Sequence, residues 1–367
     1  MGPLNGIKIV EFAGIGPGPF CGMALADLGA EVITINRINE KGIYNKFDIH
    51  NRSKYSLTAD LKKIATRGEI LKLLSQVDGL IEGYRPGVME SLGLGPDDCF
   101  KINPKIVYGR MTGWGQDGPM SKNAGHDINY ISLTGALGAM GRKNSPPSPP
   151  LNLIGDYGGG GMHLALGMTA AFVHQIKTGE GQVVDSAMID GTSMLMSFFY
   201  SFNQMGYWED ARESNLLDGA AHFYDTYECA DGKFLAIGSI EPKFYSIFLE
   251  KLEITDKDFL NQMDKSKWTE LKDKVTKIIL TKTRDEWALI FDNTDGCVTP
   301  VLSISEAPLN EHNIQRKTFT TLDGVIQPNP SPRFSKSALG IKHNSKEKGA
   351  DSSKLIEKFN LDPKAFN

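Results

Sequence analysis

Residues 7–36 carry the pattern of a β-strand, a helix and a second β-strand, and this pattern limits the possible folds more than any other feature. Residues 7–12 (IKIVEF) and 31–36 (EVITIN) are short β-branched runs typical of buried strands. Between them, a loop rich in glycine and proline (14–19) leads into an amphipathic helix that stops at Gly29. Because such a unit crosses over right-handed above a parallel sheet, the sequence predicts an α/β fold.

The glycine loop is similar to a dinucleotide-binding fingerprint but departs from it twice. Pro19 stands where a third glycine is expected, and Arg37 ends the second strand where an NAD enzyme carries an acidic residue. A cation at Arg37 suits a ribose phosphate, so an NADP-dependent oxidoreductase is one interpretation. A tight strand-to-helix turn with a solvated arginine explains the same residues equally well.

Further strands are expected along the chain at 53–62, 77–84, 106–112 and 182–187. Two of them end in loops that combine glycine, an aromatic residue and a nearby arginine, which is Arg85 in one and Arg110 in the other. The carboxyl ends of parallel strands form one crevice where ligands bind, so a site is expected there. Coverage of the surface is the alternative role for each arginine.

A chain of 367 residues exceeds the usual size of a single core, so we expect two domains. The large domain is expected over 1–200. A smaller α+β domain is expected over 220–315, with linkers at 201–219 and 316–329.

The smaller domain opens with the strongest hairpin signal in the chain. Two strand-like runs, 223–230 and 233–239, flank Asp231-Gly232, a pair that fits a type I′ turn. Later elements are expected as helices at 242–252, 268–280 and 284–291 and as a short strand at 297–302. A last helix is expected in the tail, at 352–359.

Two helical segments, 162–176 and 193–205, are apolar nearly all round. They carry more hydrophobic surface than a monomer of this size buries, which favours an extensive oligomer interface. Met194, Met196 and Met205 suit either a yielding surface for an acyl chain or plain core packing.

The composition excludes several classes of partner and site. A formal net charge of −4 gives no indication of a nucleic-acid partner, and no apolar run approaches the roughly 18 residues of a membrane span. Four scattered cysteines without a CxxC pair argue against a zinc ribbon, so no metal is expected, and they favour an intracellular setting. Because neither end carries a readable targeting signal, a cytoplasmic location is the default expectation, with mitochondrion and peroxisome left open.

The residues best suited to chemistry lie between Gly125 and Gly161. His126 and Asp127 stand in an expected loop, and loop residues on a rigid scaffold carry function more often than residues inside elements. The Pro-rich connector 143–150 suits neither a helix nor a central strand. Asp156 then precedes four glycines that lead into an apolar helix.

Asp156 and Glu241 each have two interpretations. Asp156 suits the N-cap of the helix that follows. However, four consecutive glycines start a helix poorly, because each loses more backbone entropy than alanine. They suit the close approach of N–H groups to an oxygen that gains negative charge. Glu241, just past the hairpin, is either an ordinary first-turn acid or the partner that orients a histidine across a domain or subunit boundary.

Motifs for several other chemistries do not occur in the sequence. It has no G-x-S-x-G, no G-x-x-x-x-G-K-[ST] and no H-E-x-x-H, so a hydrolase elbow, a P-loop and a zincin site are unsupported. What remains is a histidine and a carboxylate near backbone that favours an oxyanion. This combination fits proton transfer at a carbon next to a carbonyl.

Eight motifs in one order resemble the family III CoA-transferase superfamily and, within it, the α-methylacyl-CoA racemases, from near the N-terminus to about residue 335. The motifs are VEFAGIGPGPFCGMALADLGAEV (10–32), IEGYRPGVMESLGLGP (81–96), RMTGWGQDGP (110–119), AGHDINYISLTGAL (124–137), PPLNLIGDYGGGGM (149–162), GQVVDSAMIDG (181–191), FYDTYECADG (223–232) and CVTPVL (297–302).

The resemblance implies a Rossmann-like large domain that includes the tail 330–367, a small domain, and an interlocked homodimer with its active site between domains of different chains. It implies that His126 and Asp156, with Asp127 beside them, are the acid/base groups, and that Glu241 is the partner of His126. Positions that line CoA in the family match Arg37, Ala59, Asp60, Leu61, Lys62, Gly83, Tyr84, Arg85, Gly125, Ile128, Asn129 and Tyr130. CoA is part of the substrate, so no separate cofactor is implied.

The implied activity is racemisation of 2-methylacyl-CoA thioesters by 1,1-proton transfer through an enolate. Ser91 stands where a close relative has an arginine, and Thr34 replaces another, which weakens the expected hold on the nucleotide end. The alternatives are a CoA-transferase similar to formyl-CoA-transferase, with Asp156 as nucleophile, and a catalytically silent acyl-CoA-binding protein. The acyl group stays open among sterol side chains, branched fatty acids and aryl-propionates.

Overall fold

The computed structural model describes residues 1–38 and 45–366, which form two compact units. The first unit contains the described residues of Met1–Ala136, Pro150–Met196 and Glu311–Asn367. The second unit contains Leu137–Pro149 and Ser197–Asn310.

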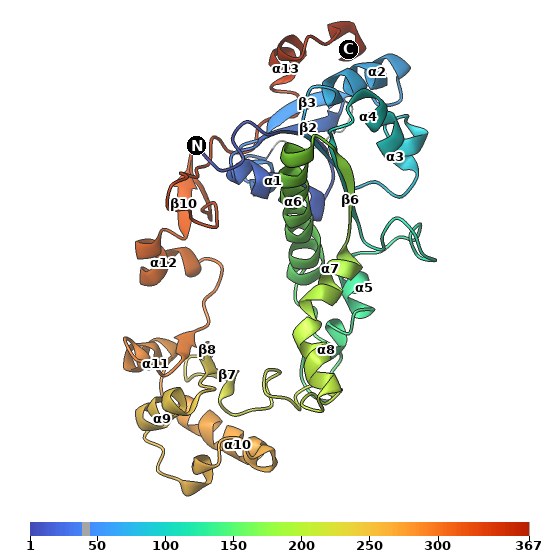
Figure 1. The fold of residues 1–367 in the computed structure, drawn as a ribbon. Helices are drawn as coiled ribbons and strands as arrows, with labels where there is room; N and C mark the ends of the chain where they lie inside the picture. Colours follow the sequence, from blue (N-terminus) through green and yellow to red (C-terminus); the bar gives the residue numbers. More distant parts are fainter. Residues whose placement is uncertain (39–44, 367) are drawn as a thin grey trace. The chain divides into compact units, whose positions relative to one another are not determined.

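A six-stranded parallel sheet forms the centre of the first unit (Figure 1). Its strands are β1 (Lys8–Phe12), β2 (Glu31–Arg37), β3 (Tyr55–Ala59), β4 (Gly79–Glu82), β5 (Val107–Thr112) and β6 (Gln182–Ala187). Their order is β3-β2-β1-β4-β5-β6, and every neighbouring pair is parallel. This is the Rossmann order, in which the direction of winding reverses between β1 and β4. The predicted α/β fold with a parallel sheet is confirmed.

Helices cover both faces of this sheet. Ile9 of β1 packs in one core with residues of α1 (Pro17–Asp27) and α6 (His163–Thr178). Val10, which points to the other face, packs in a second core with α2 (Ile64–Leu74), α4 (Pro96–Ile102) and α13 (Ser352–Lys358). The C-terminal α13 therefore completes the core beside the N-terminal strands (Figure 1). Shorter helices of the unit are α3 (Val88–Ser91), α5 (Asp127–Ser132), α7 (Met188–Leu195) and α12 (Glu311–Arg316).

The glycine run is part of a π-helix, Leu153–Met162, which continues directly into α6. The prediction that these glycines avoid a helix and present free N–H groups is therefore wrong, because each N–H of a π-helix bonds the carbonyl five residues earlier. Asp156 is likewise inside the helix rather than at its N-cap. The glycines allow close packing instead: a Cβ on Gly159 would lie 2.6 Å from the Thr192 nitrogen, and one on Gly161 would lie 2.7 Å from the Phe20 ring.

Two Asp-Gly pairs form different hairpin turns. In the second unit, β7 (Tyr224–Glu228) and β8 (Phe234–Gly238) are antiparallel as predicted, and β9 (Val298–Pro300) extends their sheet. Their turn is closed by the Gly232 N–H, which donates to the Cys229 carbonyl over 3.0 Å, and Gly232 has a φ of 72° whereas Asp231 has no positive φ. A type I′ turn needs positive φ at both central residues, so that prediction is wrong.

The type I′ pattern occurs instead in the first unit, within the predicted linker 316–329. Strands β10 (Phe319–Leu322) and β11 (Val325–Pro328) form a two-stranded antiparallel hairpin there. Asp323 and Gly324 both have positive φ, 48° and 78°, and Leu322 pairs directly with Val325. The two-residue loop matches the twist of the strands, so part of this segment forms a regular hairpin.

Helices α9 (Pro242–Lys251), α10 (Trp268–Ile279) and α11 (Arg284–Phe291) pack on the β7-β8-β9 sheet around Phe248, Trp268 and Trp287. The predicted helix over 193–205 is two helices, α7 and α8 (Ser197–Gln204), because the chain turns at Met196. Within the ranges 1–38 and 45–366, no helix has the length and hydropathy needed to cross a membrane.

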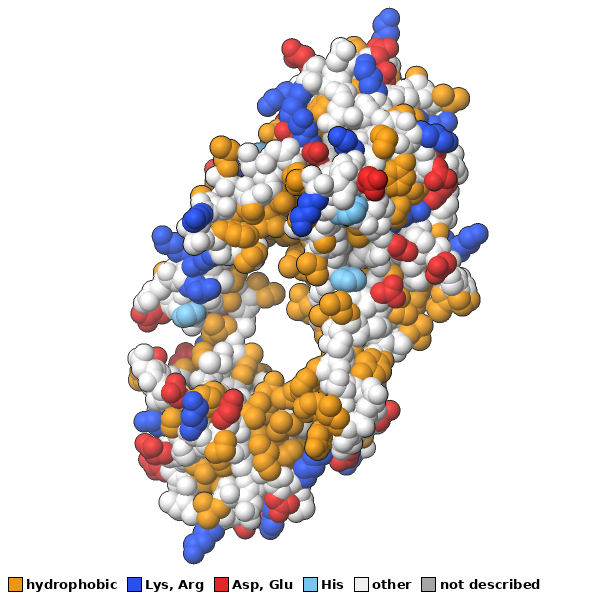
Figure 2. Space-filling model, in the orientation of Figure 1, with side chains coloured by type: hydrophobic (Ala, Val, Ile, Leu, Met, Phe, Trp, Pro, Cys, Tyr) orange, Lys and Arg blue, Asp and Glu red, His pale blue; other side chains and the backbone are white. Residues whose placement is uncertain are grey.

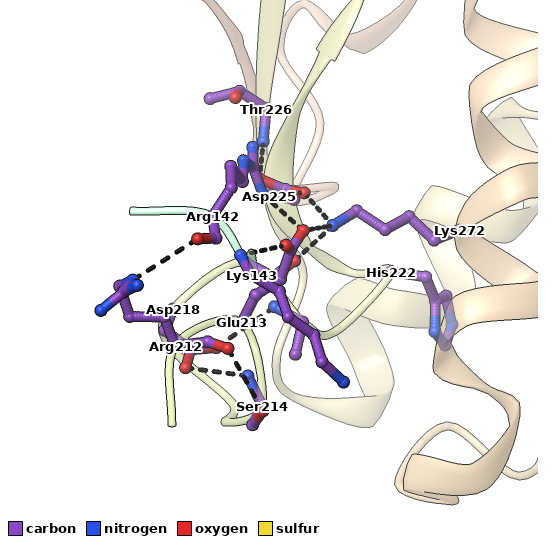
Figure 3. A network of polar contacts seen from close by, with 12 residues as sticks. Arg142, Lys143, Arg212, Glu213, Ser214, Asp218, His222, Asp225, Thr226 and Lys272 are labelled. Atoms are coloured by element: carbon purple, nitrogen blue, oxygen red, sulfur yellow. Dashed lines mark hydrogen bonds and ion pairs between the residues drawn. The ribbon is translucent and has the colours of Figure 1, made fainter. Parts of the chain in front are cut away.

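A charged network explains why residues 137–149 belong to the second unit although they fall inside the range expected for the large domain. Arg142 donates to both carboxylate oxygens of Asp225 over 2.7 and 2.8 Å (Figure 3). Lys272 of α10 contacts Asp225 over 2.6 Å and Glu213 over 2.9 Å. The Lys143 N–H also donates to Glu213. These ion pairs attach the Pro-rich connector to β7 and α10.

His222, near this network (Figure 3), makes the stability of the second unit dependent on pH. Its side chain is fully buried and its Nε2 lies 2.7 Å from the Tyr245 hydroxyl. Burial lowers the pKa of His222 from 6.5 to about 4. In the unfolded chain His222 therefore binds a proton near pH 6.5, whereas in the folded chain it binds one only near pH 4. The free energy of unfolding consequently falls as the pH falls from 6.5 to 4.

We expect His222 to lower the free energy of unfolding by about 1.4 kcal/mol for each unit that the pH falls, or by about 3 kcal/mol between pH 6.5 and 4. His222→Gln, which stays neutral and can still bond the Tyr245 hydroxyl, should flatten the dependence. Urea unfolding of both proteins at pH 6.5 and 4.5 measures the difference. If the free energy of unfolding changes equally between the two pH values in both proteins, His222 is not the titrating group.

Candidate active site

A pocket of about 420 Å³ lies at the carboxyl ends of β1, β4 and β5, where the winding of the sheet reverses. Its walls come from the loops after these strands, from the N-terminus of α1, from the loop before α5 and from the π-helix. Ligands of open α/β sheets bind at such a switch point. Of the predicted site residues, the pocket brings together Gly83, Tyr84, Arg85, Gly125, His126, Asp127, Tyr130 and Asp156.

His126 stands at the N-cap of α5 and is exposed. Its backbone N–H donates to Asn129 Oδ1 over 3.0 Å, which fixes the start of the helix. Gly125 before it packs closely, since a Cβ there would lie 2.7 Å from the Tyr130 ring and 3.1 Å from the Trp114 ring. The imidazole lines the pocket from this helix N-terminus, where His126 and Asn129 form a capping box. The ring is thus held at the pocket by a firm backbone.

Asp156 is held at the same pocket by the π-helix and by α1. Asn152, four residues earlier, donates its Nδ2 to Asp156 Oδ2 over 3.0 Å. Gly16, the residue before α1, has a φ of 75° and passes so close that a Cβ on it would lie 3.1 Å from the same oxygen. The N-terminal end of α1 is therefore near the carboxylate, and the positive end of a helix dipole favours its negative charge.

Asp127 differs from its two neighbours in being buried, with only 7% of its surface exposed. Its Oδ1 accepts the N–H of Asp156 over 2.7 Å. Burial raises the pKa of Asp127, and the N–H groups of Asp156 and Gly155 act in the opposite direction. The carboxylate thus contacts the backbone that carries Asp156.

Arg110 does not face the pocket but supports one of its walls. It is 6% exposed, and its guanidinium donates to Glu82 over 2.9 Å and to Glu90 over 2.8 Å. Glu82 in turn accepts the Tyr84 N–H over 2.7 Å, at the base of the loop that carries Arg85. Burial raises the pKa of Glu82 to about 7. Of the two arginines at strand ends, Arg85 lines the pocket and Arg110 fixes its loop.

The other predicted site residues lie elsewhere. Arg37 lines a second pocket of the first unit, about 370 Å³, together with Thr58 and Lys346. The residues that line neither of these two pockets are Ala59 at the end of β3, Asp60, Leu61 and Lys62 after it, and Ile128 and Asn129 on α5. Glu241 is exposed at the N-cap of α9 in the second unit, and its pairing with His126 stays a prediction.

Sequence reasoning missed Asn152, Gly16 and Trp114, which lie at this site. Asn152 contacts Asp156, and Trp114 lines the pocket with its Nε1 buried and without a partner in the described chain. The spacing of four between Asn152 and Asp156 is the available signal, because it places both on one side of a helix. Because the glycine run indicates a loop rather than a helix, the spacing of Asn152 and Asp156 did not predict their contact.

Comparison with known proteins agrees with the fold and the motifs. The family model described as CoA-transferase family III matches residues 4–348. The alpha-methylacyl-CoA racemase of Mus musculus is 46% identical over 329 residues, which cover 90% of this chain and 85% of that protein. The human alpha-methylacyl-CoA racemase is 42% identical over 332 residues, covering 90% and 86%.

A solved structure of a CAIB/BAIF family protein from Brucella suis has the same fold. It superposes with a TM-score of 0.84 over 98% of this chain and 99% of the other, at 22% identity. The match of the family model over nearly the whole chain, together with relatives above 40% identity, shows the family. The chain belongs to CoA-transferase family III.

Proposed function

We propose that the protein interconverts the (2R) and (2S) forms of 2-methylacyl-CoA thioesters by 1,1-proton transfer. The observation that carries the proposal is a pocket that contains both an exposed imidazole, His126, and a carboxylate, Asp156, on separate elements of one compact unit. Two bases of different kind beside one cavity suit the removal of a proton from one face of a carbon and its return to the other. The identity to two racemases supports the same activity.

In the proposed reaction, the base on one face removes the α-proton and the C–H electron pair moves into the thioester, which becomes an enolate. The acid on the other face then donates a proton to the α-carbon, and the thioester re-forms. His126 and Asp156 exchange roles for the other hand of the substrate. Pro17 and Pro19 of the first turn of α1 have no N–H, so the Gly18 N–H, which has no partner within the helix and lies at the pocket, provides positive potential for the enolate.

We further propose that CoA lies along the loop that carries Gly83, Tyr84 and Arg85, with Arg37 nearer the nucleotide end. CoA enters as part of the substrate. The cation of Arg85 is exposed at the pocket and suits a phosphate or the polar arm of CoA. The firm base that Glu82 and Arg110 give this loop supports the assignment, because an ordered loop loses less entropy on binding.

A second copy of the chain is part of the proposal, as an interlocked homodimer in which Glu241 of one chain orients His126 of the other. Hydrophobic side chains gather over the lower end of α8 (Figure 2). In α8 and the residues just after it, Phe198, Met205 and Tyr207 are 46%, 64% and 68% exposed. A surface of this kind marks an interface.

Sedimentation equilibrium should give twice the mass of one chain at micromolar concentration, and a monomer active at full rate would contradict the dimer.

The experiment that tests the activity separates racemase from CoA-transferase. Enzyme is incubated with (2R)-2-methylacyl-CoA without any second carboxylic acid, and the acyl group is resolved by chiral chromatography. A racemase gives both epimers in this mixture. A transferase leaves the epimer unchanged, moves CoA once a second acid is added, and yields an aspartyl hydroxamate with hydroxylamine because Asp156 becomes acylated.

A further inference from the structure

The Asp127 carboxylate contacts the backbone of the π-helix, and direct action on a substrate does not explain this contact. Its Oδ1 is occupied by the Asp156 N–H at 2.7 Å, and the Gly155 N–H also acts on the carboxylate. Its Oδ2 is buried and has no hydrogen-bond partner among the described residues. Neither oxygen is therefore presented to a ligand in the pocket.

These contacts coincide with the start of the π-helix. The first N–H groups of any helix have no partner inside it, and in a π-helix the unpaired stretch is longer because each bond spans five residues. Gly155 and Asp156 lie in that first turn, Leu153 being the first residue. Asp127 is the side chain that accepts from them, so it does for this helix what an N-cap residue does for an ordinary one.

Gly155 is adapted to this contact. A Cβ on Gly155 would lie 2.4 Å from Asp127 Oδ1 and 3.0 Å from the Ile131 side chain. Only glycine lets the helix start so close to α5. The sequence thus provides both the acceptor and the space that it needs.

We propose that Asp127 is a positioning residue that holds the first turn of the π-helix and so sets the direction of the Asp156 carboxylate, while taking no proton itself. The proposal rests on the proposed function, since it assigns how one of the two bases is aimed. A displacement of about 1 Å at a reacting group costs on the order of 10²-fold in rate. The effect should be confined to the face of the substrate that Asp156 serves.

Exchange of the α-proton with solvent measures the action of each base on its own face of the substrate. In deuterated buffer, one hand of the substrate loses its proton to His126 and can regain a deuteron on the same face. The other hand does the same through Asp156. The wild-type enzyme should exchange both hands, and each single base should support exchange of one hand only.

The test compares Asp127→Ala with Asp127→Asn in the full-length protein, using (2R)- and (2S)-2-methylacyl-CoA. The amide keeps an oxygen for the Asp156 N–H, so we expect exchange within about fivefold of wild type. The alanine variant removes the acceptor, and we expect exchange of the Asp156-dependent hand to fall about 10²-fold while the other hand changes less than fivefold. Asp78→Asn is the matched control, because Asp78 accepts the Lys8 N–H over 2.8 Å outside the pocket.

Several results would overturn the proposal. One is an Asp127→Asn enzyme that melts normally yet exchanges neither hand, which would make Asp127 a proton carrier. Another is an Asp127→Ala enzyme that matches wild type or that slows both hands equally. If the alanine variant does not fold, Gly155→Ala decides, since its methyl group must push Asp127 aside and should slow the same single hand. A wild-type enzyme that exchanges neither hand would refute the proposed function instead, whatever the variants do.

Discussion

Asp156→Ala should abolish epimerisation and leave α-proton exchange for one hand of the substrate. The carboxylate is the base on one face, so its loss removes a general acid/base contribution of about 10²–10⁴-fold there. His126 remains and still exchanges the hand that it serves. The measurement is the rate of chiral conversion together with epimer-resolved deuterium uptake.

The fold should survive this substitution, because Asp156 is half-buried at the pocket and its side chain accepts only from Asn152 within the described ranges. Asp190→Ala, at an exposed acid in the first turn of α7, is the control and should keep wild-type rates. An Asp156→Ala enzyme that still converts one epimer to the other would remove Asp156 from the reaction.

His126→Ala is expected to have an effect of the same size on the opposite hand. The imidazole is exposed at the N-cap of α5, so its removal should lower the free energy of unfolding by about 1 kcal/mol at most. Epimerisation should stop, and exchange should persist only for the hand that Asp156→Ala loses. The two variants together thus assign each base to one face.

The control for this variant is His174→Ala, at an exposed histidine on α6 away from the pocket. It should keep full activity. If His126→Ala unfolds, the residue is structural. If it loses exchange of the same hand as Asp156→Ala, the two groups act on one face and the two-base mechanism is wrong.

The parallel sheet could be predicted because its strands read as short β-branched runs, and the central strands β1, β4 and β5 are buried. The run at 7–12 corresponds to β1, Lys8–Phe12, and 182–187 is β6. Helix α11, Arg284–Phe291, has the predicted bounds, since Thr283 and Glu286 form a capping box at its start. Local signals of this kind do not depend on distant contacts.

The π-helix could not be predicted, because its stability comes from distant residues. Glycine disfavours a helix by its entropy, and four in a row predict a loop. In the folded chain, close packing on α1 and α7 and the Asp127 carboxylate outweigh that cost. Asn152 escaped notice for the same reason.

Turn type and unit membership were also decided by context. Asp231-Gly232 and Asp323-Gly324 are the same dipeptide, yet only the second has positive φ at both residues. Residues 137–149 lie between the two proposed bases in sequence but join the second unit through Arg142 and Asp225. An ion pair between residues so far apart in sequence leaves no local pattern.

The central claim is that the enzyme moves a proton between the two faces of one carbon, and proton NMR tests it most directly. The wild-type protein is added to (2R)-2-methylacyl-CoA in deuterated buffer without a second carboxylic acid. The account predicts that the α-proton signal disappears, that the methyl doublet collapses and that both epimers accumulate. An α-proton signal that persists while CoA moves to an added acid would contradict it and identify a transferase.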